Sequence, residues 1–321
     1  MGDEFTLRVP FRFGNRTTLH GGGFPHSLVL CGRSAVIEEH TNRYVIVVEG
    51  FPDEVAAKDF VGCVHTALRF MGISKYLPVE FTAEFSNLES VSKKRGMKSA
   101  FPSLDGFDLF SPNGLAPSVH PSSMRMTELE FTAEHGGSSI GIIPEVIELI
   151  EKGSNSKELF GSFPDRVQDA VDLYKQHYYE MSDRSRLLIL MVAIERLFEA
   201  GNKHDVATKL LEKWAIEVKG ELKKYKEGTA EYSDLSSLEG ELKRAKETSK
   251  GSKLRGLVRD RLSDDSVKEM EKKAVKSYGT RSKLVHGDDV SDQEIYEALR
   301  DSEEILSRVL LRAFQSESGV Q

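Results

Sequence analysis

Two residues that can act together on a phosphodiester, Arg281 and His286, lie five positions apart in the C-terminal part of the chain. The guanidinium of Arg281 can donate two parallel hydrogen bonds to phosphate oxygens. Histidine, the residue type at position 286, is the side chain that most readily takes up or releases a proton in proteins. Cleavage of RNA without a metal needs a base for the 2′-hydroxyl, an acid for the departing 5′-oxygen and a positive charge for the phosphorane. These two residue types therefore suit a ribonuclease site.

A capped helix is expected to carry both residues. Ser266 and Glu269 form a capping-box pattern at its start, and Gly287 is a typical C-terminal glycine. Five residues along a regular helix turn through about 500°, so Arg281 and His286 would point roughly 140° apart. We therefore expect the helix to end between them. The spacing alone is also explained by side chains that only cap carbonyls and form surface ion pairs.

The segment Tyr278–Gly287 resembles the signature of HEPN domains, which are helical bundles with an arginine and a histidine four to six residues apart. It is most similar to the Apea-like branch of that family. The segment 186–198 is similar to the earlier apolar helix of the branch, and its matching positions are Ala193, Glu195 and Phe198. The resemblance covers about residues 166–314 and implies a helical bundle with metal-independent endoribonuclease activity.

The resemblance also implies the roles of individual residues. Arg281 and His286 would be catalytic in a homodimer, in which two copies of each residue meet and supply both the acid and the base. The supporting residues would be Ser282, Lys283, Glu195 and Tyr278. The RNA-binding residues would be Lys272, Lys273 and Lys276. Many active members carry Asn, Asp or His directly after the arginine, where this chain has Ser282. No cofactor and no metal are expected, and the family suggests a toxin or phage-defence setting.

The charge of the chain limits how it would bind RNA. The formal net charge is -7, so RNA is repelled on average. Residues 268–283 differ, with six basic side chains against two acidic ones, a local net charge of +4. We therefore expect a small basic surface that binds RNA selectively or weakly. The alternative is a non-catalytic HEPN module that dimerises or binds a nucleotide or RNA, with the N-terminal domain recognising a regulatory partner or ligand.

Proline usage divides the chain. All ten prolines lie between Pro10 and Pro164, and the rest of the chain is rich in Leu, Lys, Glu and Ala. Because proline breaks helix interiors, this distribution predicts an all-α domain over residues 165–321 and an α+β domain over residues 1–164. The sequence indicates no catalytic role for the α+β domain, which we expect to regulate the helical one.

Periodicity predicts the elements of the α+β domain. Strands are expected at 5–13, 27–37 and 43–49, and a helix is expected at 53–71 with Asp53 as its N-cap. The segments 81–85 and 128–135 are candidates for further strands.

Two short motifs in this domain look like parts of a serine esterase. The run 20–23, His-Gly-Gly-Gly, is similar to an oxyanion-hole loop, and the run 137–141 places Ser139 in a nucleophile-elbow pattern. An elbow needs a buried parallel strand before the serine, but residues 128–135 alternate between polar and apolar types. A glycine-rich turn explains the motif better.

The two cysteines, Cys31 and Cys63, are too few for a disulfide framework or a cysteine-based metal site. We therefore expect reduced thiols and a cytoplasmic location. No apolar run is long enough for a membrane-spanning helix, so a membrane is not an expected partner.

Overall fold

The structure is a computed structural model. It describes residues 4–14, 18–20, 23–40, 43–82, 84–85, 115–123, 139–156, 158–198, 203–246, 248–262 and 266–315. The chain forms two compact units, of which the first contains Met1–Tyr179 and Leu310–Gln321, and the second contains Glu180–Val309. An antiparallel sheet dominates the first unit and helices dominate the second, which confirms the predicted order of an α+β part followed by a helical part.

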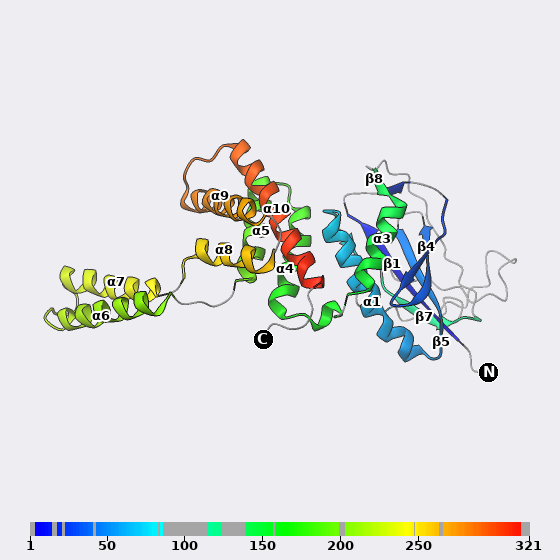
Figure 1. Ribbon diagram of the computed structural model, residues 1–321, viewed down its shortest axis with the longest axis horizontal. Coiled ribbons are helices and arrows are strands. Elements are labelled where there is room, and N and C mark those ends of the chain that lie inside the picture. The colour runs from blue at the N-terminus through cyan, green and yellow to red at the C-terminus, as the bar shows by residue number, and fades with distance from the viewer. Residues whose placement is uncertain are drawn as a thin grey trace, which may run out of the picture. The chain divides into compact units, whose positions relative to one another are not determined.

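The strands all belong to the first unit. They are β1 Phe5–Phe13, β2 Thr18–His20, β3 His26–Leu30, β4 Arg33–His40, β5 Arg43–Phe51, β6 Val79–Glu80, β7 Ser118–Pro121 and β8 Ser139–Ile142. Six of them form an antiparallel sheet in the order β3-β4-β5-β1-β6, in which β7 also pairs with β1 (Figure 1). β1 and β5 lie at the centre of the sheet, and most of their residues are buried. β2 and β8 form a separate parallel pair.

The predicted strands 5–13 and 43–49 are confirmed as β1 and the main part of β5. The prediction of one strand over 27–37 is wrong, because the chain turns between β3 and β4 at Cys31 and Gly32. Both residues have positive φ, 47° and 78°, as the two central residues of a tight hairpin turn require. Apolar residues continue on both sides of this turn, so the pattern of apolar residues does not mark its position.

Two other strand predictions have different outcomes. The prediction of a strand at 81–85 is wrong for the residues that the structure describes there. Pairing along β6 stops at Glu80, and residues 81, 82, 84 and 85 are irregular. The segment 128–135 lies outside the described residues.

Helices α1 Glu54–Ser74 and α3 Ile143–Ser154 lie against the sheet of the first unit. This unit also contains α4 Asp165–Gln176 and the short 3-10 helices at Phe160–Ser162 and His177–Tyr179. The predicted N-cap of α1 is confirmed, because the Asp53 carboxylate accepts a hydrogen bond of 2.8 Å from the Ala56 amide. α1 lies closely against α3 at Gly153, where an added Cβ would be 2.6 Å from the Cβ of Phe70. Only glycine permits this approach of the two helices.

The two cysteines are paired. Cys31 in the hairpin turn and Cys63 on α1 form a disulfide, so the expectation of two reduced thiols is contradicted. The number of cysteines does not reveal this pairing, because it depends on α1 lying against the β3–β4 turn.

The end of the chain returns to the first unit. Helix α10, Asp292–Gln315, begins in the second unit, and its residues from Leu310 onward belong to the first. There the Phe314 ring is 4% exposed and lies against the rings of Phe70, Phe160 and Phe163. α4 also belongs to the first unit, so the compact units divide after Tyr179, whereas composition changes at Pro164.

The second unit consists of helices. They are α5 Asp183–Arg196, α6 Asp205–Leu222, α7 Ala230–Ala245, α8 Lys250–Arg261, α9 Val267–His286 and the first part of α10. α5 buries five residues, among them Leu187, Leu190 and Ile194, and is therefore a central helix of this unit, as its apolar stripe predicts. No helix in the described part of the chain is long and apolar enough to cross a membrane.

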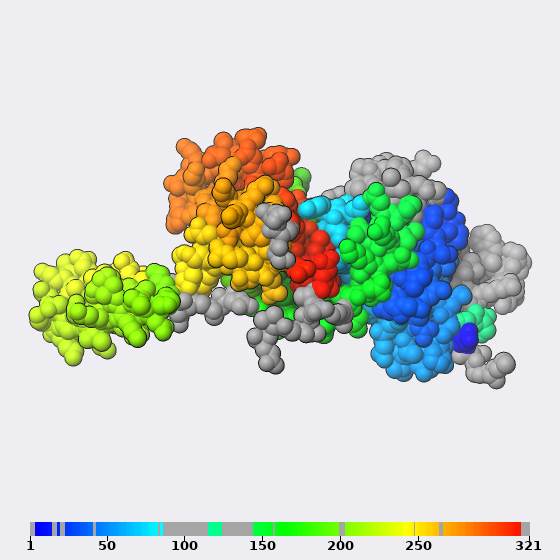
Figure 2. Space-filling model, in the orientation of Figure 1, coloured from blue at the N-terminus to red at the C-terminus, as the bar shows by residue number. Residues whose placement is uncertain are grey.

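Helices α6 and α7 form a charged helical hairpin. They lie side by side, and Figure 2 shows their side chains in contact. Leu211 is the one buried residue of α6, and α7 has none. The apolar side chains of α6 are instead largely exposed, with Val206 and Ile216 both 72% exposed.

The serine-esterase reading finds no support in the described backbone. Ser139 is the first residue of β8, whereas an elbow serine follows its strand and precedes the helix. β8 runs on to Ile142, and α3 begins directly after it.

Candidate active site

One helix carries both residues of the predicted pair. α9 continues through Arg281 and ends with His286, and Gly287 follows with a φ of 80°. The amide of Asp288 donates a hydrogen bond of 3.0 Å to the carbonyl of Lys283, which closes the last turn. Gly287 is therefore confirmed as the C-terminal glycine, but the expectation that the helix ends between Arg281 and His286 is wrong. On one continuous helix the two side chains leave roughly 140° apart.

The Arg281 guanidinium faces α5. Its Nη2 lies 3.6 Å from Oε1 of Glu195, and the two side chains are only 22% and 20% exposed. The other carboxylate oxygen of Glu195 accepts a hydrogen bond of 2.9 Å from Lys250 at the start of α8. One carboxylate therefore holds two cations from two other helices.

The Arg281–Glu195 contact is an ion pair rather than a hydrogen bond. The Glu195 Oε1 atom and the Arg281 Nε atom are both buried, and neither has a hydrogen-bond partner among the described residues. The ring of Tyr278, one turn earlier on α9, has its centre 5.7 Å from the guanidinium carbon. Ser282 is half-buried. The guanidinium therefore has donor capacity left for a further anion.

His286 has different surroundings. Its side chain is exposed, and so are those of Asp288 and Asp289 just beyond Gly287. The side chain of Val285 beside it is 53% exposed, which is unusual for a valine in a helical bundle. The histidine is therefore accessible to solvent or to another molecule, whereas Arg281 is largely enclosed.

The starts of α9 and α10 differ. Ser291 and Glu294 form a capping box at the start of α10: the Glu294 amide donates to Ser291 Oγ at 3.2 Å, and the Ser291 amide donates to the Glu294 carboxylate at 3.1 Å. The capping box predicted at the start of α9 is wrong. The Ser266 side chain makes no capping hydrogen bond, because its backbone is already helical, with φ of -83° and ψ of -6°.

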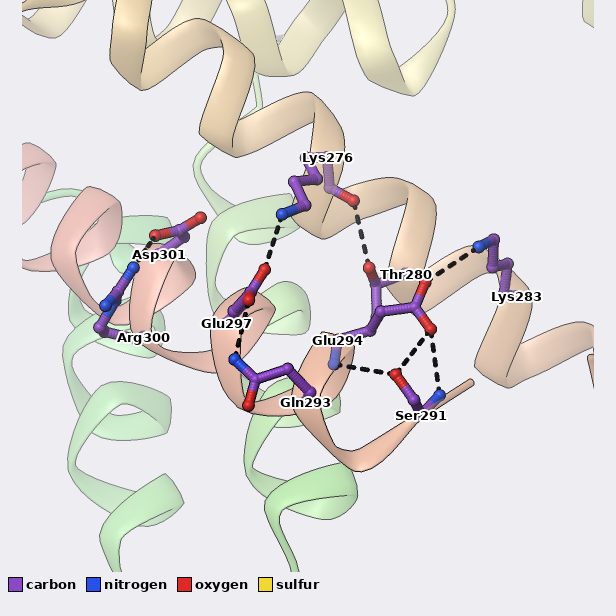
Figure 3. A network of polar contacts seen from close by, with 9 residues as sticks. All are labelled: Lys276, Thr280, Lys283, Ser291, Gln293, Glu294, Glu297, Arg300 and Asp301. Carbon is purple, nitrogen blue, oxygen red and sulfur yellow. Dashed lines mark hydrogen bonds and ion pairs between the residues drawn. The ribbon is translucent and has the colours of Figure 1, made fainter. Parts of the chain in front are cut away.

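The lysines of α9 are paired with carboxylates of α10 (Figure 3). Lys276 donates a hydrogen bond of 2.8 Å to Glu297, and Lys283 donates one of 3.3 Å to Glu294. Farther from the capping turn, Lys273 donates one of 2.9 Å to Glu304.

This pairing changes the charge that the sequence suggested. The hydrogen bond that Lys276 donates to Glu297 raises the pKa of Lys276 and lowers the pKa of Glu297, so both groups are charged at neutral pH. The local excess of positive charge counted along residues 268–283 is therefore offset by acids from α10. Lys272 is exposed on α9. The surface expected to bind RNA through Lys272, Lys273 and Lys276 is thus less basic than the net charge of residues 268–283 suggests.

A second arginine–histidine pair in the chain has no such setting. Arg33 begins β4 and His40 ends it. The Arg33 guanidinium lies over the Phe51 ring at 4.6 Å, and His40 lies 3.4 Å from the carboxylate of Glu38. These are surface contacts of a sheet.

Two sets of contacts were not predicted from the sequence. They are the contacts of the α9 lysines with carboxylates of α10 and the contact of Glu195 with the lysine of α8. Glu294, Glu297 and Glu304 recur at spacings of three and seven residues on α10, a pattern that signals one charged helix face. No local signal marks Lys250 as the partner of Glu195, because 55 residues separate them.

In the described ranges, no three His, Cys, Asp or Glu side chains gather closely enough to hold a metal ion. Comparison with protein-family models, with curated proteins and with solved structures finds no match to this chain.

Proposed function

We propose that the chain is a metal-independent endoribonuclease whose active site is completed by two protomers, each contributing Arg281 and His286. The observation that carries the proposal is the enclosed Arg281, which Glu195 holds at 3.6 Å while its Nε donor has no hydrogen-bond partner among the described residues. A guanidinium held in this way is oriented before a phosphate arrives, and such preorganisation favours stabilisation of developing charge. The resemblance to HEPN domains supports the same residues.

The need for a second protomer follows from the helix. Arg281 and His286 leave α9 in divergent directions, so one copy of the chain does not bring them together. A two-fold axis near the end of α9 would place the His286 of each copy near the Arg281 of the other. The exposed Val285 beside His286 supplies apolar surface for such a contact.

The reaction would proceed within the RNA. One His286 takes the proton of the 2′-hydroxyl, and the 2′-oxygen forms a bond to phosphorus. The bond from phosphorus to the 5′-oxygen breaks, and the second His286 gives that oxygen a proton. Arg281 stabilises the charge on the phosphorane oxygens. The products are a 2′,3′-cyclic phosphate and a 5′-hydroxyl.

The experiment is incubation of the purified full chain with mixed RNA, with and without EDTA, followed by analysis of the product ends. We expect cleavage in both conditions, a cyclic phosphate or its hydrolysis product, and no cleavage of DNA, which lacks the 2′-hydroxyl. A strict need for Mg²⁺ or Mn²⁺ in the chemical step would contradict the mechanism. In a toxin or defence setting, expression of the chain would also arrest growth, and His286→Ala would relieve the arrest.

A specific observation favours a second candidate, a non-catalytic module that dimerises or binds a nucleotide or RNA. Lys273, Lys276 and Lys283 are all engaged by carboxylates of α10, so they offer little charge to a long RNA. A dimer that binds a nucleotide saturably but leaves RNA intact would support this candidate over the nuclease.

A further inference from the structure

A pocket lies in the first unit, between the second half of α1, the residues around β6, and α4, and encloses about 470 Å³ when the solvent at its open mouth is included. Its lining is mixed, with more apolar than polar side chains. The apolar side chains include Leu68, Ile73, Leu77, Val79 and Val171. Arg69, Lys175 and Asp172 supply the charged groups of the lining. A concave and largely apolar site with a few convergent polar groups is the usual form of a small-molecule site.

Arg69 is held in an uncommon way. Its guanidinium carbon lies 3.9 Å from the centre of the Phe160 ring and 4.8 Å from the centre of the Phe81 ring. Because the N–H groups of a guanidinium lie in its plane, contact with rings leaves those donors unused. Among the residues that the structure describes, none accepts a hydrogen bond from Arg69 or forms an ion pair with it.

Lys175 on α4 approaches the same ring. Its Nζ lies 5.8 Å from the centre of Phe81, and it too makes no hydrogen bond or ion pair within the described ranges. Burial lowers the pKa of Arg69 to about 10, and burial also lowers the pKa of Lys175, with Glu80 acting in the opposite direction. The guanidinium therefore keeps its charge at neutral pH.

Two half-buried cations that have no hydrogen-bond acceptor among the described residues cost free energy. A charged donor taken out of water loses its hydration, and rings alone replace only part of it. An anion between Arg69 and Lys175 would accept the unused hydrogen bonds of both. An anion in the open space beside these two side chains would therefore satisfy their unused donors.

The charges around the pocket set the charge of that occupant. Glu80 is already engaged, because its carboxylate accepts hydrogen bonds from Arg12 at 2.5 Å and from Tyr179 at 2.7 Å. With Glu80 balanced by Arg12, the cations Arg69 and Lys175 face one further acid, Asp172. The net charge left is +1, which matches one negative charge.

We propose that this pocket binds a small monocarboxylate with an aliphatic or aromatic body. The carboxylate lies against Arg69 and Lys175, because the planar fork of a guanidinium matches two carboxylate oxygens. The body lies against Phe81 and the apolar walls. The proposal is independent of the nuclease, since every residue it uses belongs to the first unit.

The other explanation of Arg69 is a structural one, in which the guanidinium only joins the two rings. The variant Arg69→Met distinguishes the structural explanation from ligand binding. Methionine keeps a long side chain in contact with the rings but removes the charge. If the charge serves a ligand, the unliganded variant melts at the same temperature as the native chain or higher. A melting temperature several degrees lower would identify a structural pin and overturn the proposal.

Binding is tested on the full chain by calorimetry, with benzoate as the probe and benzamide as its uncharged match. We expect saturable binding of benzoate, no binding of benzamide at the same concentrations, and an affinity at least tenfold lower in Lys175→Met. Lys152→Met is the matched control, since Lys152 is an exposed lysine on α3, outside the pocket, and it should bind benzoate as the native chain does. Sodium chloride keeps the ionic strength equal in all samples.

Three results of the binding experiments would also overturn the proposal. The first is the absence of benzoate binding, and the second is equal binding of benzoate and benzamide. The third is tighter binding of phenyl phosphate than of benzoate, which would contradict the single negative charge. Circular dichroism of Lys175→Met shows whether a loss of binding comes from the site or from unfolding.

Discussion

The carboxylate of Glu195 on α5 lies 3.6 Å from the Arg281 guanidinium on α9 and also accepts a hydrogen bond from Lys250. Three helices of the second unit therefore meet at one acidic side chain. Because Arg281 and Glu195 are both about four-fifths enclosed, this ion pair is screened less than one on the surface. The position of Arg281 depends on Glu195, and this dependence can be measured.

Glu195→Gln is expected to reduce RNA cleavage by about tenfold, and Arg281→Lys by about a hundredfold or more. Glutamine keeps the shape of the side chain but loses the charge that orients the guanidinium. Since the proposed role of Glu195 is to position Arg281 without contacting RNA, the loss should appear in kcat, with KM unchanged or lower. Glu212→Gln, at an exposed ion pair with Lys246, is the control. Native kcat in Glu195→Gln would show that Glu195 does not position Arg281.

His286→Ala is expected to reduce cleavage by about a hundredfold or more, because it removes the group that transfers protons. The fold should be retained, since the side chain is exposed at a helix end. His40→Ala, which alters the strand-borne histidine, should leave cleavage unchanged. Cleavage rates and circular dichroism spectra of the three proteins provide the measurement.

Mixed dimers extend this test to the oligomeric state. If the two copies of His286 act as acid and base in one site, a dimer of native chain and His286→Ala should fall well below half of native activity. A dimer with half of native activity would mean that each protomer carries an independent site.

Glu297→Gln is expected to strengthen RNA binding and to make it more salt-dependent. The substitution frees Lys276 from its partner, and each additional phosphate contact steepens the dependence of log affinity on log salt by about 0.7 to 0.9. Glu221→Gln frees Lys224, which follows the end of α6, in the same way and at a distance from the site along the chain, and serves as the control. An unchanged salt slope in Glu297→Gln would place Lys276 outside the RNA-binding surface.

Acid should destabilise the first unit through His65. Burial, with a smaller contribution from the Arg69 charge, lowers the pKa of His65 from 6.5 to about 3. The unfolded chain therefore takes up this proton first, so the stability present at pH 7 is lost as the pH falls from 6.5 toward 3. The loss approaches ~1.4 kcal/mol per pH unit for this one group.

His65→Phe should reduce that acid sensitivity, because phenylalanine keeps the ring that stacks on Phe81 at 4.5 Å but does not titrate. Urea denaturation at several pH values gives the free energy of unfolding of each protein. His286→Ala, an exposed histidine, is the control and should retain the native slope. The same slope in His65→Phe would assign the acid sensitivity to other groups.

Phe314→Ala is expected to destabilise the first unit by about 3 to 5 kcal/mol, because it leaves a cavity among Phe70, Phe160 and Phe163. Val206→Ala, at a side chain that is 72% exposed, should change stability little. Thermal denaturation of both variants checks this. Equal stability would mean that the end of α10 is not part of the core of the first unit.

Local backbone requirements made several features predictable from the sequence. Asp53 caps α1, Gly287 ends α9, and Ser291 with Glu294 caps α10, because each needs only neighbouring residues to satisfy it. The periodicity of apolar residues likewise predicted the central strands and α5, since burial of one face depends on spacing along a single element.

Tertiary structure alone decided which charges meet. The lysines of α9 look like a basic surface until α10 places Glu297 and Glu304 beside them. Cys31 and Cys63 look like two separate thiols until α1 lies against the hairpin turn. Arg69 meets the ring of Phe160 although 91 residues separate them. A charge, a thiol or a ring acts through space at a few ångströms, and only the packing of distant elements determines what lies within that range.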